Sequence, residues 1–150
     1  MNIILASKSP RRIELLKNIV DSFEIMPANI DEDAITSQNI EQIPQLLAVN
    51  KARYIADSHS YALVIGCDTG VFIDGKMLGK PKSESEAFEM LTTLSGRTHK
   101  VITGCAIVYN GEIIEFSEET DVTFTLLDED NIRKYISYGE CMDKAGAYGI

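Results

Sequence analysis

An uninterrupted apolar run near the middle of the chain, residues 62–67 (ALVIGC), constrains the fold more than any other feature. Such runs are typical of strands that are buried on both faces, as in sheets covered by helices. Residues 42–57 carry apolar side chains at helical spacing, with Pro44 in the first turn, where a helix tolerates proline. Asp68 and Thr69 follow the run, at the expected C-terminal end of the strand, where ligands bind in open α/β sheets. The run predicts an α/β protein with a binding site after this strand.

The N-terminal part of the chain has the order strand, loop and helix. Residues 2–6 are apolar, a Ser-rich turn follows, and apolar residues then recur at helical spacing up to Val20. Residues 23–26 are expected to form a second strand, and residues 27–33 an acidic loop that contains Glu32. A basic segment is thus followed by an acidic one.

Turn and cap residues divide the second half into short elements. The pairs Asp74-Gly75 and Asn110-Gly111 are typical of two-residue hairpin turns. Ser83 and Glu86 form a capping-box pattern, and Gly96 marks the end of that helix. No repeat or linker interrupts the chain, so residues 1–150 are predicted to form one domain. These signals predict strands at 71–73, 76–78, 100–109, 112–116 and 120–126, and helices at 83–95 and 128–138.

The charge balance limits the partners that the chain can bind. Its formal net charge is −9, which repels nucleic acid and anionic membranes, so any cationic site must be local. No apolar run approaches the length of a membrane span, and we identify no targeting segment. The three cysteines have no metal-ligand spacing, and their odd number fits a reducing cytosol better than a disulfide scaffold. We interpret them as small buried side chains and expect a cytoplasmic protein.

Arg11 and Arg12 stand where a helix should begin, because Ser9 suits the N-cap and Pro10 the first helical position. A cation beside the positive end of the helix dipole is unfavourable by roughly 0.3–1 kcal/mol. The arrangement becomes favourable when an anion docks, because backbone N–H groups, the Ser7 and Ser9 hydroxyls and both guanidinium groups can bind phosphate oxygens. This segment therefore predicts a phosphate site.

Four further residues can complete such a site, although each also has a simpler interpretation. Lys51 and Lys80 are phosphate ligands or solvated surface charges. Asp68 is a general base or a metal ligand, with a carboxyl pKa raised by partial burial, or it is an aspartate that starts a turn. Glu32 is a Mg²⁺ ligand or part of a solvated acidic loop. With the arginines, these residues predict a phosphate-binding pocket that has a carboxylate base and a divalent metal.

Other catalytic classes lack their sequence signals. His59 and His99 have no partner at metal-ligand spacing, so we interpret both as surface or capping residues. Ser7 and Ser9 lack the flanking glycines of a GxSxG nucleophile elbow, and the chain has no GxxxxGK[ST] phosphate loop. Composition and spacing predict no more specific chemistry than the phosphate pocket.

Several motifs stand in order over nearly the whole chain. They are LASKSPRR at 5–12 followed by Glu14, NKA at 50–52, DT at 68–69, LGKP at 78–81 and DKAGAYGI at 143–150. Together they resemble the Maf family. The resemblance implies an α/β fold with a mixed, strongly twisted sheet flanked by helices and a central cleft, as in Maf and ITPase-like proteins. It also implies a nucleoside triphosphate pyrophosphatase that uses Mg²⁺ or Mn²⁺ and releases a nucleoside monophosphate and diphosphate.

The resemblance also implies a role for each matching residue. Asp68 is similar to the family's catalytic proton acceptor, and Glu32 matches an acidic residue of the pocket, so both are expected metal ligands. Water activated by Asp68 would attack the α-phosphorus while cations neutralise the departing diphosphate. The expected substrate-binding residues are Ser7, Ser9, Arg11, Arg12, Lys51, Thr69 and Lys80.

Two positions of the resemblance bear on the substrate. Arg11, directly after the motif's proline, resembles the family branch that acts on dTTP and UTP, whereas tryptophan there would indicate 7-methyl-GTP. Thr69 matches a second specificity position. The third, a glutamine, would follow Ile150, so we expect a Maf-like domain that lacks its C-terminal strands.

Two rival functions remain open on the sequence. The chain could be a nucleotide-binding regulator of septum formation that acts through a protein partner, binding nucleotide without releasing diphosphate. It could also bind nucleic acid through the arginines, but the acidic balance and the lack of interleaved aromatic and basic residues argue against that. We expect a nucleotide-pool enzyme with a nucleoside triphosphate substrate and no nucleic-acid or membrane partner, and a homodimer is compatible with this function.

Overall fold

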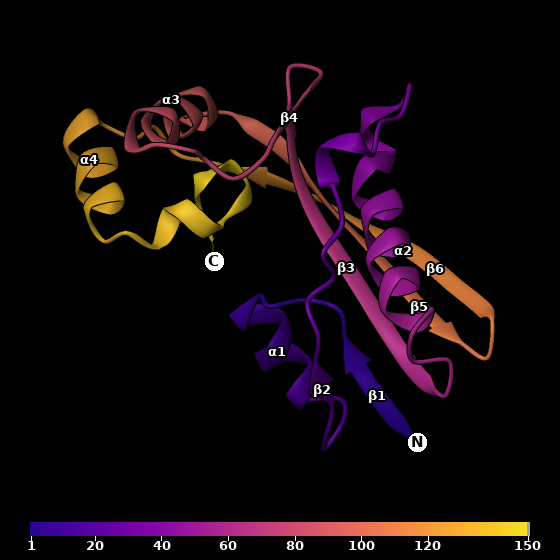
Figure 1. Cartoon of the computed structure of the whole chain (residues 1–150). Helices are drawn as coiled ribbons and strands as arrows, with labels where there is room; N and C mark the ends of the chain where they lie inside the picture. The colour runs from indigo at the N-terminus through magenta and orange to yellow at the C-terminus, as the bar shows by residue number, and fades with distance from the viewer. Residues whose placement is uncertain (150) are drawn as a thin grey trace. The chain divides into compact units, whose positions relative to one another are not determined.

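The computed structural model describes residues 1–149 and confirms an α/β protein with a mixed sheet flanked by helices (Figure 1). The strand order is β2-β1-β3-β5-β6, with β4 paired to β3. The chain divides into two compact units, Met1–Asp68 with Thr103–Glu118, and Thr69–Ile102 with the chain from Glu119 onward. Among the described residues, no helix combines the length and the apolar content that a membrane span requires.

The first unit contains the parallel part of the sheet. Strand β1 pairs in parallel with β2 on one side and with β3 on the other, where Asn2 lies opposite Ala62 and Leu5 opposite Ile65. The elements of this unit are β1 (Asn2–Leu5), α1 (Pro10–Lys17), β2 (Glu24–Ile25), α2 (Ile43–Ala56) and the adjoining parts of β3 (Ala62–Ile73), β5 (Thr98–Tyr109) and β6 (Glu112–Thr123).

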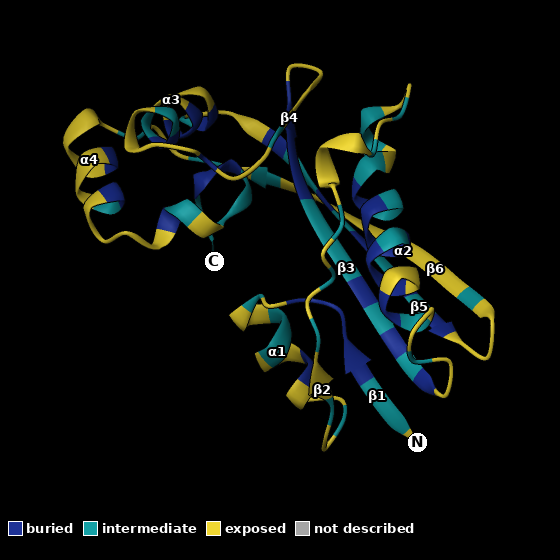
Figure 2. Ribbon diagram, in the orientation of Figure 1, coloured by how far each residue is buried: buried dark blue, intermediate teal, exposed yellow. Residues whose placement is uncertain are grey.

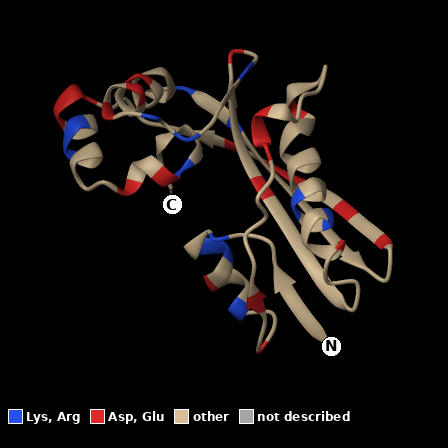
Figure 3. Cartoon of the chain, in the orientation of Figure 1, with Lys and Arg blue, Asp and Glu red and all other residues tan. Residues whose placement is uncertain are grey.

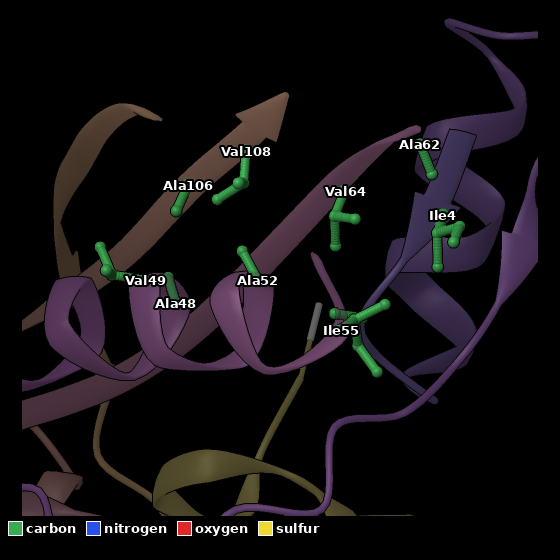
Figure 4. Packing of buried hydrophobic residues seen from close by; sticks show 10 residues of the cluster. Ile4, Ala48, Val49, Ala52, Ile55, Ala62, Val64, Ala106 and Val108 are labelled. Carbon is green, nitrogen blue, oxygen red and sulfur yellow. The ribbon is translucent and has the colours of Figure 1, made fainter. Parts of the chain in front are cut away.

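Small residues let α2 pack closely against the sheet in the first unit. Ala48 and Ala52 of α2 are fully buried against Val64 of β3 and Ala106 of β5 (Figure 4). Gly66 is required at this contact, because a Cβ there would lie 2.2 Å from the backbone oxygen of Ala48. This close approach is what brings the middle of α2 to the strand that carries Asp68.

We predict that Gly66→Ala destabilises the protein by about 1–3 kcal/mol, because overpacking against helix backbone cannot be relieved by a rotamer change. The measurement is the midpoint of urea unfolding. Gly79→Ala is the matched control, since a Cβ at Gly79 would meet no atom within 4 Å and the residue has no positive φ. Equal midpoints for the two variants would show that α2 does not need this approach.

The structure corrects the expected end of the central strand. The sequence predicts that the strand ends at Cys67, but β3 continues through Asp68 to Ile73, so Asp68 lies within a strand. The parallel pairing with β1 nevertheless stops at Ile65. Asp68 therefore lies just beyond the carboxyl end of the parallel segment, and this preserves the physical basis of the predicted site. In the same way, the two strands predicted at 112–116 and 120–126 form the single strand β6 up to Thr123.

The second unit contains β4 (Lys76–Leu78), α3 (Glu84–Leu94) and α4 (Glu129–Ser137), and its turns and caps follow the sequence. Asp74 and Gly75 both have positive φ, as a type I′ turn requires. Ser83 caps α3 by accepting a hydrogen bond from the Glu86 amide, and Asp128 caps α4 in the same way. Buried residues of α3 and α4 form the core of this unit, whereas β6 is exposed along almost its whole length (Figure 2).

His99 is buried in the second unit, which corrects its interpretation as a surface or capping residue. It is 3% exposed, its Nε2 lies 2.6 Å from the Tyr148 hydroxyl, and its Nδ1 has no partner among the described residues. The rings of Phe124 and Tyr148 meet it edge-on. Burial lowers the pKa of the His99 imidazole below its ordinary value of 6.5, so the folded state favours the neutral ring.

We predict that His99 makes the folded protein less stable as the pH falls below about 6.5. The unfolded chain takes up a proton in this range that the buried ring resists, so the free energy of unfolding decreases with falling pH. Urea unfolding at a series of pH values measures the slope, which His99→Phe should reduce. His59→Gln, at a partly exposed histidine of the other unit, is the matched control, and equal slopes in the two variants would contradict the role of His99.

Candidate active site

Lys51 is the centre of a group of charged side chains in the first unit. It lies on α2 and is 9% exposed, an unusual burial for lysine that requires paired charges. Its Nζ lies 2.6 Å from Asp68 Oδ1 and 3.0 Å from Glu32 Oε1. Glu32 begins a short 3₁₀ turn in the acidic loop and is half exposed. One ammonium group therefore joins a strand carboxylate to a loop carboxylate.

The environment of Asp68 changes its acidity. Burial raises the pKa of its carboxyl above the ordinary value of 3.8, and the negative charge of Glu32 acts in the same direction. Lys51 and Arg12 oppose this rise because they stabilise the carboxylate. The prediction that partial burial raises this pKa is confirmed. A carboxylate with a raised pKa is a better proton acceptor than an ordinary aspartate, as general-base chemistry requires.

Arg12 is held by contacts with β3 and with the loop before α1. Its Nη1 donates to the Cys67 carbonyl at 2.8 Å and to the Ser7 hydroxyl at 3.3 Å. Ser7 also accepts a hydrogen bond from the Ser9 amide at 3.2 Å and is 8% exposed. The guanidinium group is thus anchored beside the residue that precedes Asp68.

The start of α1 lies where the sequence predicts it. Pro10 is the first helical residue and Ser9 occupies the N-cap. Within the described chain, the Ser9 side chain makes no capping hydrogen bond. Arg11 is exposed whereas Arg12 is partly buried, so the two arginines have different environments at the basic start of α1 (Figure 3).

Two predicted substrate-binding residues belong to the second unit. Thr69 follows Asp68 directly in β3 and is the first residue of that unit. Lys80 is exposed in the segment between β4 and α3. A hydrogen bond joins Ser7 to Arg12, and ion pairs join Lys51 to Glu32 and Asp68, all within the first unit.

The carboxylates are compatible with a divalent metal that arrives with a phosphorylated ligand. Residues 1–149 contain no group of three or more His, Cys, Asp and Glu side chains that would form a self-contained metal site. Glu32 and Asp68 are brought together by Lys51, whose Nζ both carboxylates contact. Mg²⁺ is usually held by only one or two carboxylates, together with substrate phosphates and water. The carboxylates are the right type of donor, and binding of Mg²⁺ or Mn²⁺ stays a prediction.

Sequence reasoning missed a pair of thiols beside the site. Cys67 of β3 and Cys105 of β5 are partly exposed, and their sulfurs lie 3.4 Å apart. This contact lowers the pKa of the Cys105 thiol to about 7, while the contact and burial raise the pKa of the Cys67 thiol. Of the three cysteines, only Cys141 is the buried side chain that the sequence predicts. The register between the two strands, which decides this pairing, leaves no signal in the sequence.

Comparisons with known proteins agree with the motifs. The family described as "Maf-like protein" matches residues 2–150. A protein named dTTP/UTP pyrophosphatase from Clostridium perfringens (strain 13) is 47% identical over 154 aligned positions, which cover the whole chain and 80% of that protein. A protein with the same name from Geobacillus sp. (strain WCH70) is 49% identical over 149 positions, which cover 99% of this chain and 80% of the relative.

Solved structures support the fold. The Ham1 protein of Staphylococcus aureus superimposes with a TM-score of 0.58 at 17% identity, covering 81% of this chain and 70% of that protein. The HAM1 protein of Coxiella burnetii gives a TM-score of 0.55 at the same identity, covering 81% and 71%. These likenesses show the fold alone. The family match over residues 2–150 and the identity with relatives over the whole chain show that the chain belongs to the Maf family.

Proposed function

We propose that the chain is a nucleoside triphosphate pyrophosphatase that hydrolyses dTTP and UTP to the monophosphate and diphosphate. The observation that carries the proposal is the buried Lys51, which joins the carboxylates of Asp68 and Glu32. The name dTTP/UTP pyrophosphatase, carried by relatives 45–49% identical to this chain, supports the proposed substrates.

In the proposed reaction, Asp68 accepts a proton from water, and the resulting nucleophile attacks the α-phosphorus of the substrate. The bond between the α-phosphorus and the oxygen that bridges to the β-phosphorus breaks, and diphosphate leaves. Arg12 and Lys51 stabilise the negative charge that collects on the leaving group. Loss of either cation, or of the contacts that hold it in place, would remove part of this stabilisation.

Other predicted residues contribute to substrate binding in this proposal. Arg11 and the hydroxyls of Ser7 and Ser9 bind phosphate oxygens at the start of α1. For Thr69 and Lys80, a role in substrate binding rests on the family resemblance alone. When bound, Mg²⁺ or Mn²⁺ held by Glu32 would neutralise triphosphate charge, whereas tight coordination by Asp68 would lower the basicity that its role as proton acceptor needs.

The proposed location is the cytoplasm. Cys67, Cys105 and Cys141 are all free thiols, which suits a reducing compartment. For the alternative role in septum formation, the described residues offer no specific support. We therefore propose the enzyme as the function.

A diphosphate-release panel tests the proposal. The purified protein is incubated with dTTP, UTP, CTP, dATP, GTP or 7-methyl-GTP, in the presence of Mg²⁺ or Mn²⁺. We expect the highest rates with dTTP and UTP and no release after chelation of the metal with EDTA. Release of inorganic phosphate instead of diphosphate, or a preference for GTP or 7-methyl-GTP, would contradict the proposed function.

A further inference from the structure

Two thiols meet across neighbouring strands of the first unit, at a position that the proposed reaction does not use. Cys67 lies on β3 and Cys105 on β5, which are adjacent in the sheet. Their sulfurs are 3.4 Å apart, and both residues are partly exposed. The third cysteine, Cys141, is fully buried in the core of the other unit. The chain thus has one pair of contacting thiols and one isolated thiol.

We propose that Cys67 and Cys105 form a reversible oxidation site, at which hydrogen peroxide converts the two thiols to a disulfide. One sulfur attacks a peroxide oxygen, the O–O bond breaks, and a sulfenic acid and one water form. The second sulfur then attacks the sulfenic sulfur, the S–S bond forms, the S–O bond breaks, and a second water leaves. Two sulfurs are oxidised and one peroxide is reduced, whichever sulfur reacts first.

The geometry suits this reaction because little movement is needed. A disulfide has an S–S length of about 2.05 Å, so the sulfurs must approach by only about 1.4 Å. Side-chain rotation and a small shift of the strands can supply that distance. A low-molecular-weight dithiol reverses the bond by thiol–disulfide exchange.

The disulfide would change the candidate active site through Cys67. The Cys67 carbonyl accepts the hydrogen bond that anchors Arg12, and the next residue is Asp68. Movement of β3 at Cys67 therefore displaces the proposed base and the bound arginine together. This part of the inference rests on the proposed function, whereas formation of the disulfide does not.

The first experiment maps the bond without using activity. The whole protein is treated with hydrogen peroxide, free thiols are blocked with iodoacetamide after unfolding in urea, and the chain is digested with trypsin without reduction. Cleavage after lysine and arginine places Cys67, Cys105 and Cys141 on separate peptides, 54–76, 101–133 and 135–144. We expect mass spectrometry to find peptides 54–76 and 101–133 joined by a disulfide, and peptide 135–144 alkylated at its thiol. Absence of that link, or links to Cys141 instead, would overturn the inference.

The second experiment measures diphosphate release from dTTP before oxidation, after oxidation and after reduction with dithiothreitol. We expect oxidation to lower the rate by about 10- to 100-fold, since a displacement of about 1 Å near the chemistry can cost 100-fold. Dithiothreitol should restore the rate. Cys105→Ala should prevent both the link and the loss, whereas Cys141→Ala, the matched control, should preserve both.

The two experiments separate failure of this inference from failure of the proposed function. A linked protein that keeps its full rate would overturn the effect on the site but not the oxidation site. If the reduced protein releases no diphosphate from any nucleotide, the proposed function fails, and peptide mapping still decides whether the disulfide forms. Oxidation of single thiols without a link would overturn the oxidation site itself.

Discussion

An Asp68→Asn protein is expected to release diphosphate from dTTP at least about 100-fold more slowly than the parent, because general-base catalysis contributes roughly 100- to 10,000-fold. An amide cannot accept the proton from water, although it preserves the shape of the side chain. It also loses the charge that Lys51 contacts at 2.6 Å. The measurement is the initial rate at saturating dTTP, together with the substrate concentration at half-maximal rate. We expect the loss mainly in the maximal rate.

Asp57→Asn is the matched control, since Asp57 is an exposed carboxylate just after α2 in the same unit. It should release diphosphate at the parental rate. If Asp68→Asn folds and keeps that rate as well, the role of Asp68 as proton acceptor is wrong. Urea unfolding of both variants shows whether a lower rate reflects chemistry or loss of folded protein.

Replacing Lys51 with methionine is expected to lower both stability and activity. The variant leaves the Asp68 and Glu32 carboxylates facing each other without the cation between them. Removal of one partner from a fully buried ion pair costs roughly 3–5 kcal/mol, and we expect about 2 kcal/mol here because Glu32 is half exposed. We also expect diphosphate release to fall by about 100-fold, since removing one group that stabilises transition-state charge costs 100- to 1,000-fold.

The stability loss in Lys51→Met should depend on pH in a defined direction. Without Lys51, which lowers it, the pKa of Asp68 rises further above its ordinary value, and the folded state then favours the protonated carboxyl. Between the raised pKa and the ordinary value of 3.8, the unfolded chain binds fewer protons than the folded protein. The destabilisation is therefore largest above the raised pKa and decreases as the pH falls through it. Urea unfolding between about pH 8 and about pH 5 measures this trend.

Arg53→Met is the control for Lys51→Met, since Arg53 is an exposed cation on the same helix. It removes one positive charge and a long side chain without touching the two carboxylates. Equal effects of the two variants on stability and rate would mean that Lys51 acts only through net charge. A stability loss in Lys51→Met that grows as the pH falls would contradict the proposed role of Asp68 in the trend.

Several elements could be predicted because their signals are local. Pro10 at the start of α1, Ser83 at the cap of α3 and Asp128 at the cap of α4 are all found where the sequence places them. The Asp74-Gly75 turn is correct for the same reason, since positive φ at two successive positions strongly limits the residues there. Each feature depends on neighbours within about four residues.

The incorrect predictions concern features that depend on residues far apart in the chain. The sequence predicts a strand that ends before Asp68, because a polar residue normally interrupts an apolar run, yet strand pairing carries β3 through it to Ile73. His99 also has no local signal of burial, because its cover comes from Phe124 and Tyr148, which are distant in the chain. Tertiary contacts overrode local preference at both positions.

The sequence by itself determined the α/β class, the helix caps, the hairpin turns and the residue types of the candidate site. Only the tertiary structure decided which of those residues meet. Asp68 reaches Lys51 because Gly66 lets α2 approach β3, and the two cysteines pair because two adjacent strands have one particular register. Helix packing distance and strand register depend on contacts between residues far apart in the chain, so local sequence patterns do not predict them.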